Sequence, residues 1–415
     1  MLNPNTNQRE LAYIVKIDNI EPIVGSDNCE AAVVGGWKVM VRKETFKPGD
    51  LAVYFEIDSH VDTNKPEFAF LEKKHGNVKT QKYTFGGKNP GFYSQGLLMS
   101  AEDFSGMCYQ DGDGRMYLHF GKDSIFGENI DMPEGTFLTE KLGVTYAEPE
   151  DNKRKAKVNP DAKINAALNR YPKIAKRWGR VIKRNKILRK LFLIFFGRKR
   201  DARNWPQWVV KTDEERVQNM SWILNDKSEW IATEKLDGTS TTFTMKRGKF
   251  GKNDFYICSR NVVFDNPNKA CFYDTNVYVE MAEKYNVKEV LTNILNENKD
   301  LEWVTIQGET FGASIQKRDY GMTDHDFRAF NFITSKDGRW NSKESAEYLN
   351  KFGIKWVPIL DEHFVLPDTV DELLTIATDA SVIDGGMREG LVFRSQDGTK
   401  SFKAVSNEFL VKYHG

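Results

Sequence analysis

Cysteine is scarce in this chain, and long apolar runs are missing. The 415 residues include four cysteines without a CxxC pair among them: Cys29, Cys108, Cys258 and Cys271. We therefore expect no zinc site, and free thiols favour a reducing, cytoplasmic location. The most apolar run, Leu191 to Phe196, is too short to span a bilayer, and Met1 to Arg9 lacks the apolar core of a signal peptide. These absences predict no membrane partner.

Acidic residues are nearly absent from one strongly basic segment. Between Lys153 and Arg203 there are 19 Lys or Arg residues against two Asp and no Glu, a local net charge of +17. The whole chain carries only +1, so the rest is acidic. Helical composition predicts helices at Lys163 to Asn169 and at Ile174 to Phe196, separated by Pro172, and the spacing of apolar and basic residues predicts that the second is amphipathic. A cluster of this kind is typical of nucleic-acid binding.

The basic segment supports two roles equally. Its phosphate-binding candidates are Lys183, Arg184, Lys186 and Arg189. The alternative is a solvated linker helix whose apolar stripe docks on a neighbouring domain, and the two roles are compatible because they use different faces. A membrane-surface role is a weaker third option.

The residue pattern predicts an α+β protein with three parts. Residues 1–150 contain short apolar runs separated by turn signals such as Lys47 to Asp50, which predicts a small β-barrel. Residues 151–203 form the basic helical linker. Residues 204–415 mix strand-like runs with helical stretches near Val277–Asn296, Lys343–Phe352 and Asp371–Thr378.

The run Lys235-Leu236-Asp237-Gly238 is the centre of the functional argument. By itself it is weak, since a K-x-D-G string arises by chance about 0.1 times in a chain of this length, and it also fits a plain turn after a strand. Further strings follow it in order: Ser259-Arg260-Asn261, Gln307 to Gly312, Phe327 to Asn331, Arg388 to Phe393 and Phe402-Lys403-Ala404.

This ordered set resembles motifs I, Ia, III, IIIa, IV and V of the covalent nucleotidyltransferases, which are the RNA ligases, DNA ligases and mRNA capping enzymes. The resemblance implies that Lys235 is a nucleophile that attacks the α-phosphorus of ATP and holds AMP as a phosphoramidate. A lysine amine must be neutral to attack, and its ordinary pKa is about 10.4. Nearby cations, including a bound metal, would lower that pKa.

The remaining motif residues suit the same reaction. Asp237, Glu309 and Glu389 are candidates to hold Mg²⁺ or Mn²⁺, largely through water molecules. Arg260 and Lys403 suit the α-phosphate, where they offset negative charge in the transition state. By resemblance, Glu309 also contacts the ribose, Phe330 stacks on adenine, and Glu234 lies with these residues around ATP.

Taken singly, each residue has an ordinary alternative. Arg260 would fit a surface ion pair, and Phe330 would fit an apolar core. Glu309 and Glu389 would fit solvated strand ends, and Lys403 would fit an exposed surface. The ordered set favours the functional interpretation over these alternatives.

Two positions depart from the family pattern. Asn331 stands where relatives carry an acidic residue after the motif IIIa aromatic. Val405 stands where the phage T4-type relatives carry a second motif V lysine. A carboxylate role and a paired-lysine role are therefore not expected at these positions.

Domain order narrows the family. DNA ligases and capping enzymes resemble one another in having an OB-fold domain after motif V, whereas only 12 residues follow Lys403 here. The β-rich part instead precedes Lys235. This order resembles the Deinococcus/Naegleria-type RNA ligases, as do the strings Trp205 to Trp208, Lys211 to Asn219 and Phe402 to Leu410. The resemblance implies an N-terminal OB-fold domain, a linker and a C-terminal nucleotidyltransferase domain with ATP-grasp-like antiparallel sheets and helices.

The family implies a three-step reaction on RNA. Lys235 is adenylylated by ATP, AMP moves to an RNA 5′-phosphate, and a 3′-OH attacks that end and releases AMP. The relatives favour nicked duplexes with RNA on the 3′-OH side, which suits repair, and we expect a monomer. The alternative is a catalytically inactive module that binds duplex RNA, and GTP is a lesser alternative to ATP. Intact motif residues favour the active enzyme.

Overall fold

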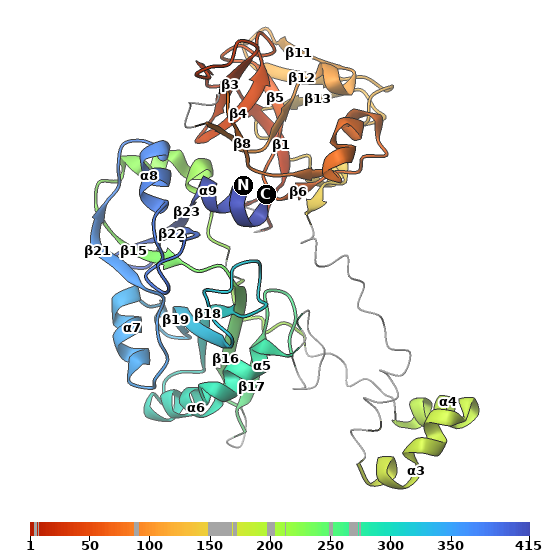
Figure 1. Ribbon diagram of the computed structural model, residues 1–415, viewed down its shortest axis with the longest axis vertical. Coiled ribbons are helices and arrows are strands. Elements are labelled where there is room, and N and C mark those ends of the chain that lie inside the picture. Colours follow the sequence, from red (N-terminus) through yellow and green to blue (C-terminus); the bar gives the residue numbers. More distant parts are fainter. Residues whose placement is uncertain are drawn as a thin grey trace.

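The computed structural model contains two compact bodies and a separate pair of helices (Figure 1). It describes residues 1–3, 6, 8–86, 91–147, 168, 172–196, 204–211, 213–248, 252–264, 273 and 275–415. The predicted helical stretch at 163–169 falls, except for Leu168, outside the described residues. No described helix is long and apolar enough to cross a membrane.

The N-terminal body is built from short strands, as predicted. Its three-stranded sheets have the orders β1-β5-β10, β2-β3-β4, β11-β12-β13 and β14-β6-β7, and β8 pairs with β9. The central strand β5 is buried along its whole length, so every residue of its run LAVYF is apolar or aromatic. The strands are β1 (Ala12–Lys16), β2 (Asn19–Pro22), β3 (Cys29–Val34), β4 (Trp37–Arg42), β5 (Leu51–Phe55), β6 (Ser59–His60), β7 (Asn77–Val78), β8 (Gln81–Tyr83), β9 (Phe92–Ser94), β10 (Leu97–Met99), β11 (Gly106–Gln110), β12 (Met116–Phe120), β13 (Ile130–Pro133) and β14 (Thr145–Tyr146). Short helices η1 (Pro66–Lys74), η2 (Glu102–Phe104) and α1 (Thr139–Leu142) connect them.

The basic segment forms two helices, α3 (Pro172–Arg184) and α4 (Lys186–Phe196), that meet at Asn185. Ile182 and Phe192 are buried there. Other apolar side chains stay exposed at helical spacing, including Trp178 at 53% and Leu191 at 44%. The pair of helices therefore has both an apolar side and basic residues in contact with solvent.

The C-terminal body holds two antiparallel sheets. One has the strand order β21-β15-β22-β23 and the other β17-β16-β18-β19-β20. The strands are β15 (Glu229–Lys235), β16 (Thr239–Lys246), β17 (Asp254–Cys258), β18 (Trp303–Gly312), β19 (His325–Thr334), β20 (Gly338–Arg339), β21 (Ile359–Val365), β22 (Gly390–Ser395) and β23 (Ser401–Val405). The helices are η4 (Val217–Asn225), α5 (Val277–Lys284), α6 (Val287–Glu297), α7 (Ser342–Asn350), α8 (Val370–Ala377), α9 (Asn407–Phe409) and the π-helix η6 (Leu410–His414).

The predicted helices of this body are present, with one correction. The stretch predicted as a single helix from Val277 to Asn296 is two helices, α5 and α6. Asn286 adopts a left-handed backbone with φ of 47°, which ends the first helix. Two large core clusters of the body lie against different sheets, one under α6 and α7 and the other under η4 and α8.

The chain passes from one sheet to the other through the turn after Lys235. Strand β15 ends at Lys235 in the first sheet, and β16 begins at Thr239 in the second. A Cβ atom at Gly238 would lie 2.3 Å from the carbonyl oxygen of Thr310, so only glycine fits this close passage. The run Lys235 to Gly238 therefore includes a turn at which the chain crosses between the two sheets.

The two bodies share an apolar core. Val405 and Leu410 pack in the same cluster as Tyr13, Trp37 and Tyr54 of the N-terminal body. Val405 is only 2% exposed. A lysine would be costly there, which gives a physical reason for the departure at this position.

Candidate active site

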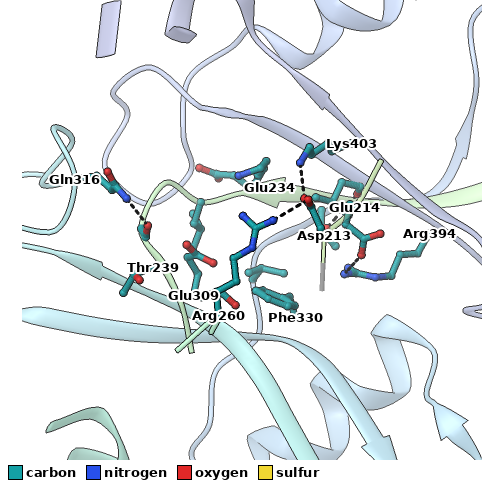
Figure 2. Close-up of a pocket in the computed structure, with 17 residues that line it drawn as sticks. Asp213, Glu214, Glu234, Thr239, Arg260, Glu309, Gln316, Phe330, Arg394 and Lys403 are labelled. Carbon is teal, nitrogen blue, oxygen red and sulfur yellow. Dashed lines mark hydrogen bonds and ion pairs between the residues drawn. The ribbon is translucent and has the colours of Figure 1, made fainter. Parts of the chain in front are cut away.

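A cavity of about 330 Å³ lies between the two sheets of the C-terminal body (Figure 2). Its volume is suited to a small ligand. It is lined by Asp213, Glu214, Thr233, Glu234, Lys235, Leu236, Gly238, Thr239, Ser240, Arg260, Glu309, Gln316, Phe330, Val357, Val392, Arg394 and Lys403.

Lys235 lies among carboxylates at one end of the cavity, which we call the acidic end. Its Nζ is 2.6 Å from Glu389 Oε1 and 2.7 Å from Glu389 Oε2. Burial alone would lower the pKa of Lys235, but Glu389, Glu309 and Asp237 raise it above its ordinary value. The resting site therefore holds the lysine as an ammonium ion.

The carboxylates of the acidic end are poorly satisfied. Burial, together with Glu389 and Asp237, raises the pKa of Glu309 to about 8. Asp237 is 6% exposed, and its Oδ2 has no hydrogen-bond partner. Its other oxygen lies 3.6 Å from His414 Nε2. In the part of the chain that the structure describes, no three His, Cys, Asp or Glu side chains converge to ligate one ion directly. The acidic end can attract a cation held through water molecules.

Basic side chains gather at the opposite end, which we call the cationic end. Arg260, just after β17, places Nη2 2.8 Å from Asp213 Oδ2. Lys403, on β23, places Nζ 3.1 Å from Asp213 Oδ1. Burial lowers the pKa of Lys403 to about 8, and Asp213 opposes that shift. This end can bind an anion such as a phosphate.

Apolar side chains and one glutamate complete the cavity. Phe330 on β19 is half-buried and lies beside Val357 and Val392 in the lining. The Glu234 carboxylate is 1% exposed and accepts a hydrogen bond from the backbone amide of Val382 at 3.0 Å. The cavity thus has an apolar wall of the kind that a planar base can pack against.

Most residues singled out in the sequence come together here. Glu234, Lys235, Arg260, Glu309, Phe330 and Lys403 line the cavity, and Asp237 and Glu389 contact its acidic end without appearing in the lining. Asn331 does not line it either. Its Nδ2 donates to Gln307 Oε1 at 3.1 Å, and it is 2% exposed.

Sequence reasoning missed several side chains of the site. Asp213, Glu214, Gln316 and Arg394 line the cavity, and His414 reaches Asp237. Asp213 and Glu214 lie in the string Lys211 to Asn219, which was noted for its resemblance but given no role. Arg394 lies near the end of β22, six residues after Arg388, and no sequence motif singles it out.

The four basic candidates of the linker lie elsewhere. Lys183, Arg184 and Lys186 are exposed and Arg189 is half-buried on α3 and α4. None of them lines the cavity. Any role that they have is separate from the chemistry of the cavity.

Two family models match parts of the chain. The family model described as RNA ligase matches residues 228–414, and an OB-fold domain model matches residues 11–99. None of the curated proteins matches the sequence.

Solved structures match almost the whole chain. A variant of the Naegleria gruberi RNA ligase with ATP and Mn is 25% identical with a TM-score of 0.68, and the match covers 98% of this chain and 100% of that one. The same ligase with PPi is 26% identical with a TM-score of 0.67, covering 98% and 99%. A variant with AMP and Mn is 26% identical with a TM-score of 0.66, at the same coverage.

These matches confirm the predicted α+β fold, with an OB-fold domain followed by a mixed domain of antiparallel sheets and helices. Residues 228–414 therefore match the RNA ligase family, and nearly the whole chain is similar to the structures of an RNA ligase that were solved with ATP or AMP.

Proposed function

We propose that the chain forms a lysyl-AMP intermediate on Lys235 and uses it to seal RNA ends at nicks in duplexes. The observation that carries this proposal is the position of Lys235 in the cavity. Its amine lies with carboxylates at the acidic end, and two cations suited to phosphate, Arg260 and Lys403, lie at the other end.

In the first step, Lys235 Nζ attacks the α-phosphorus of ATP. A nitrogen–phosphorus bond forms, the bond to the bridging oxygen breaks, and pyrophosphate leaves. Arg260 and Lys403 offset the negative charge that develops on the α-phosphate. Phe330 stacks on the adenine, Glu309 contacts the ribose, and Glu234 completes the nucleotide site.

A divalent cation, Mg²⁺ or Mn²⁺, fits the acidic end. Asp237 has an unpartnered buried oxygen, and Glu309 and Glu389 lie beside Lys235. These three carboxylates would hold the ion, largely through its waters. Its charge would offset the carboxylates that keep Lys235 protonated, and the amine would become available for attack.

The next two steps use RNA. A 5′-phosphate oxygen attacks the phosphorus of lysyl-AMP, the nitrogen–phosphorus bond breaks, and a 5′-5′ pyrophosphate end forms. A 3′-OH then attacks the RNA phosphate, and AMP leaves. We place the enzyme in the cytoplasm, which fits the free thiols of Cys29, Cys108 and Cys258. We also expect it to act as a monomer.

Labelling with α-³²P-ATP and magnesium tests the proposal. Wild-type protein should carry a labelled band and Lys235→Ala should carry none. Lys336→Ala is the matched control, because Lys336 is an exposed lysine paired with Asp300. A wild type without label would point to an inactive RNA-binding module, and labelled GTP in the same assay tests nucleotide choice. Nicks with ribose or deoxyribose at each junction position test end sealing.

We also propose that the basic helices contact RNA phosphates through Lys183, Arg184, Lys186 and Arg189. Changing all four to glutamine should weaken binding of a nicked RNA duplex and lower the salt slope by about one per lost contact. Adenylylation of Lys235 should stay within about two-fold of wild type. Lost adenylylation, with RNA binding retained, would assign these residues to domain docking instead.

A further inference from the structure

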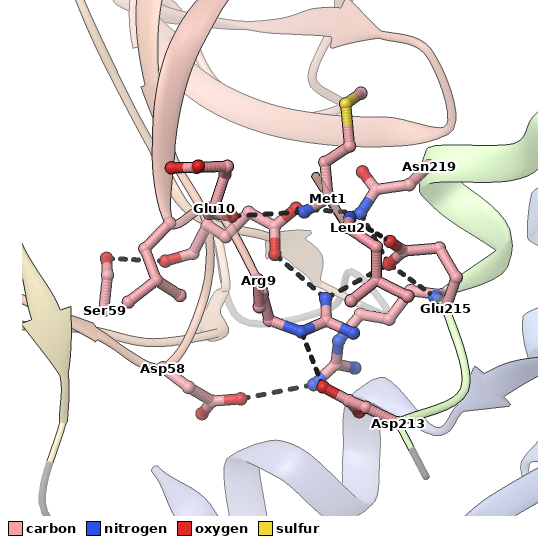
Figure 3. Close-up of polar contacts among 12 residues, drawn as sticks. Met1, Leu2, Arg9, Glu10, Asp58, Ser59, Asp213, Glu215 and Asn219 are labelled. Carbon is pink, nitrogen blue, oxygen red and sulfur yellow. Dashed lines mark hydrogen bonds and ion pairs between the residues drawn. The ribbon is translucent and has the colours of Figure 1, made fainter. Parts of the chain in front are cut away.

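Asp213 contacts three basic side chains that come from distant parts of the chain. Its Oδ2 lies 3.1 Å from Arg9 Nε and 2.8 Å from Arg260 Nη2, and its Oδ1 lies 3.1 Å from Lys403 Nζ. The side chain is only 20% exposed. Figures 2 and 3 show the two sides of this arrangement, with the cavity cations in one and Arg9 in the other.

The Asp213 carboxylate occupies the two cations that suit a nucleotide phosphate. One of its oxygens faces Arg260 and the other faces Lys403, so the pair is bridged by a single anion. A phosphate group that enters the cavity competes with this carboxylate for both cations, because both anions form charge-assisted hydrogen bonds with the same guanidinium and ammonium groups.

Arg9 differs from the other two partners because it does not line the cavity. It belongs to the OB-fold domain, is 7% exposed, and also contacts Glu56 Oε2 at 3.2 Å and Glu215 Oε1 at 3.1 Å (Figure 3). A nucleotide can therefore take Arg260 and Lys403 from Asp213 without reaching Arg9. The displaced carboxylate keeps one cation, which matters because a largely buried, unpaired charge is costly.

The OB-fold domain meets the cationic end at a second point. The Arg260 guanidinium lies 5.9 Å from the centre of the Tyr146 ring, and Tyr146 is in β14 of that domain. The position of Arg260 thus depends on Asp213 and on the OB-fold domain together.

We propose that Asp213 is an internal counter-anion, which pairs with Arg260 and Lys403 at the phosphate site of the resting enzyme and yields them to the nucleotide while it stays anchored to Arg9. When a phosphate binds, Arg9 is the only one of the three basic partners that Asp213 keeps. Because Arg9 belongs to the OB-fold domain, nucleotide binding is linked to the docking of that domain. The inference rests on the proposed function, since it takes Arg260 and Lys403 as the phosphate ligands.

Titration calorimetry with AMP tests this idea without any chemical step. The full-length protein is first treated with pyrophosphate and magnesium to remove bound AMP. Asp213→Asn removes the competing anion and should bind AMP about five-fold more tightly than wild type. Arg9→Gln leaves the displaced carboxylate without a cation and should bind AMP about ten-fold more weakly.

The double variant separates this role from simple support of the fold. In the Asp213→Asn background no charge is displaced, so adding Arg9→Gln should change AMP affinity by less than about two-fold. If Arg9 only supported the fold, Arg9→Gln would weaken AMP binding by the same factor in both backgrounds. Asp226→Asn is the matched control, because Asp226 also pairs with a lysine, Lys400, but lines no part of the cavity.

Two results would overturn the inference. One is AMP binding by Asp213→Asn that is equal to or weaker than that of wild type, and the other is an equal effect of Arg9→Gln in both backgrounds. If melting curves show that Arg9→Gln is unfolded, Arg9→Lys takes its place, and its AMP affinity should fall between that of wild type and the expected ten-fold loss. The affinity of Asp213→Asn for AMP still shows whether Asp213 competes with the phosphate. Labelling by ATP is scored separately, so a wild type that binds AMP but is not labelled would count against the ligase mechanism alone.

Discussion

The two ends of the cavity are opposites in charge. At the acidic end, one cation, Lys235, lies among three carboxylates. At the cationic end, one carboxylate, Asp213, lies among three cations. In both places the isolated charge is held by a surplus of groups of the other sign.

This difference shows how neighbours decide the state of a buried group. Lys235 and Lys403 both lose solvation, which lowers the pKa of a lysine. Yet the pKa of Lys235 is raised by its three carboxylates, whereas the pKa of Lys403 falls to about 8, with Arg216 and Arg9 adding to the effect of burial. Each end is suited to a different part of the reactants, a metal ion at one and a phosphate at the other.

Removing one carboxylate from the acidic end should have the largest effect. Glu389→Gln removes the negative charge that pairs with Lys235 and that is also one of the proposed metal-holding charges. The single-turnover rate of AMP transfer to the protein should therefore fall at least about 100-fold. Glu362→Gln is the control, since Glu362 forms an exposed pair with Lys343. A rate within about three-fold of wild type would remove Glu389 from the mechanism.

The two charged ends suit a metal ion and a phosphate, so we expect the adenine base to be recognised by the apolar wall between the sheets. Phe330→Ala removes the ring proposed to stack on adenine, and the ATP concentration for half-maximal adenylylation should rise about ten-fold. Phe330→Tyr keeps the ring and should stay close to wild type. If the two variants behave alike, Phe330 is part of the packing and not of the adenine site.

The sequence predicted the fold and the chemical motifs but not how charges are shared across the cavity. Lys235, Glu309 and Lys403 sit in ordered strings, and each string marks a strand end or strand that the fold brings to one place. Asp213 and Arg9 carry no such local pattern. Their roles arise from a contact between residues 204 positions apart, and pairing over that distance depends on how two domains pack, which local sequence does not encode.

The cationic end should respond to pH through Lys403. Its pKa is lowered to about 8, so its positive charge is present below that pH and is lost as the pH rises through it. AMP affinity should therefore fall about two-fold between pH 7 and pH 8 and about five-fold more between pH 8 and pH 9. Lys403→Arg stays charged and should flatten this decline. Calorimetry across the range checks it, and equal slopes in both proteins would assign the titration to another group.

The smallest effect on the reaction is expected at Asn331, where the family usually has a carboxylate. Asn331 lies outside both ends of the cavity and donates to Gln307 Oε1, while Gln307 Nε2 is already bonded to the Val210 carbonyl at 2.9 Å. Asn331→Asp would place a buried carboxylate against that acceptor and lower the free energy of unfolding by about 2 kcal/mol.

Adenylylation by the folded Asn331→Asp protein should nevertheless stay within about two-fold of wild type, because neither the acidic nor the cationic end changes. Urea denaturation and single-turnover labelling measure the two effects separately. Asn129→Asp is the control, since Asn129 is exposed and its Oδ1 only accepts a bond from the Lys122 amide. A faster reaction in Asn331→Asp would mean that this position takes part in metal binding, and that the acidic end extends from Glu309, Asp237 and Glu389 to β19.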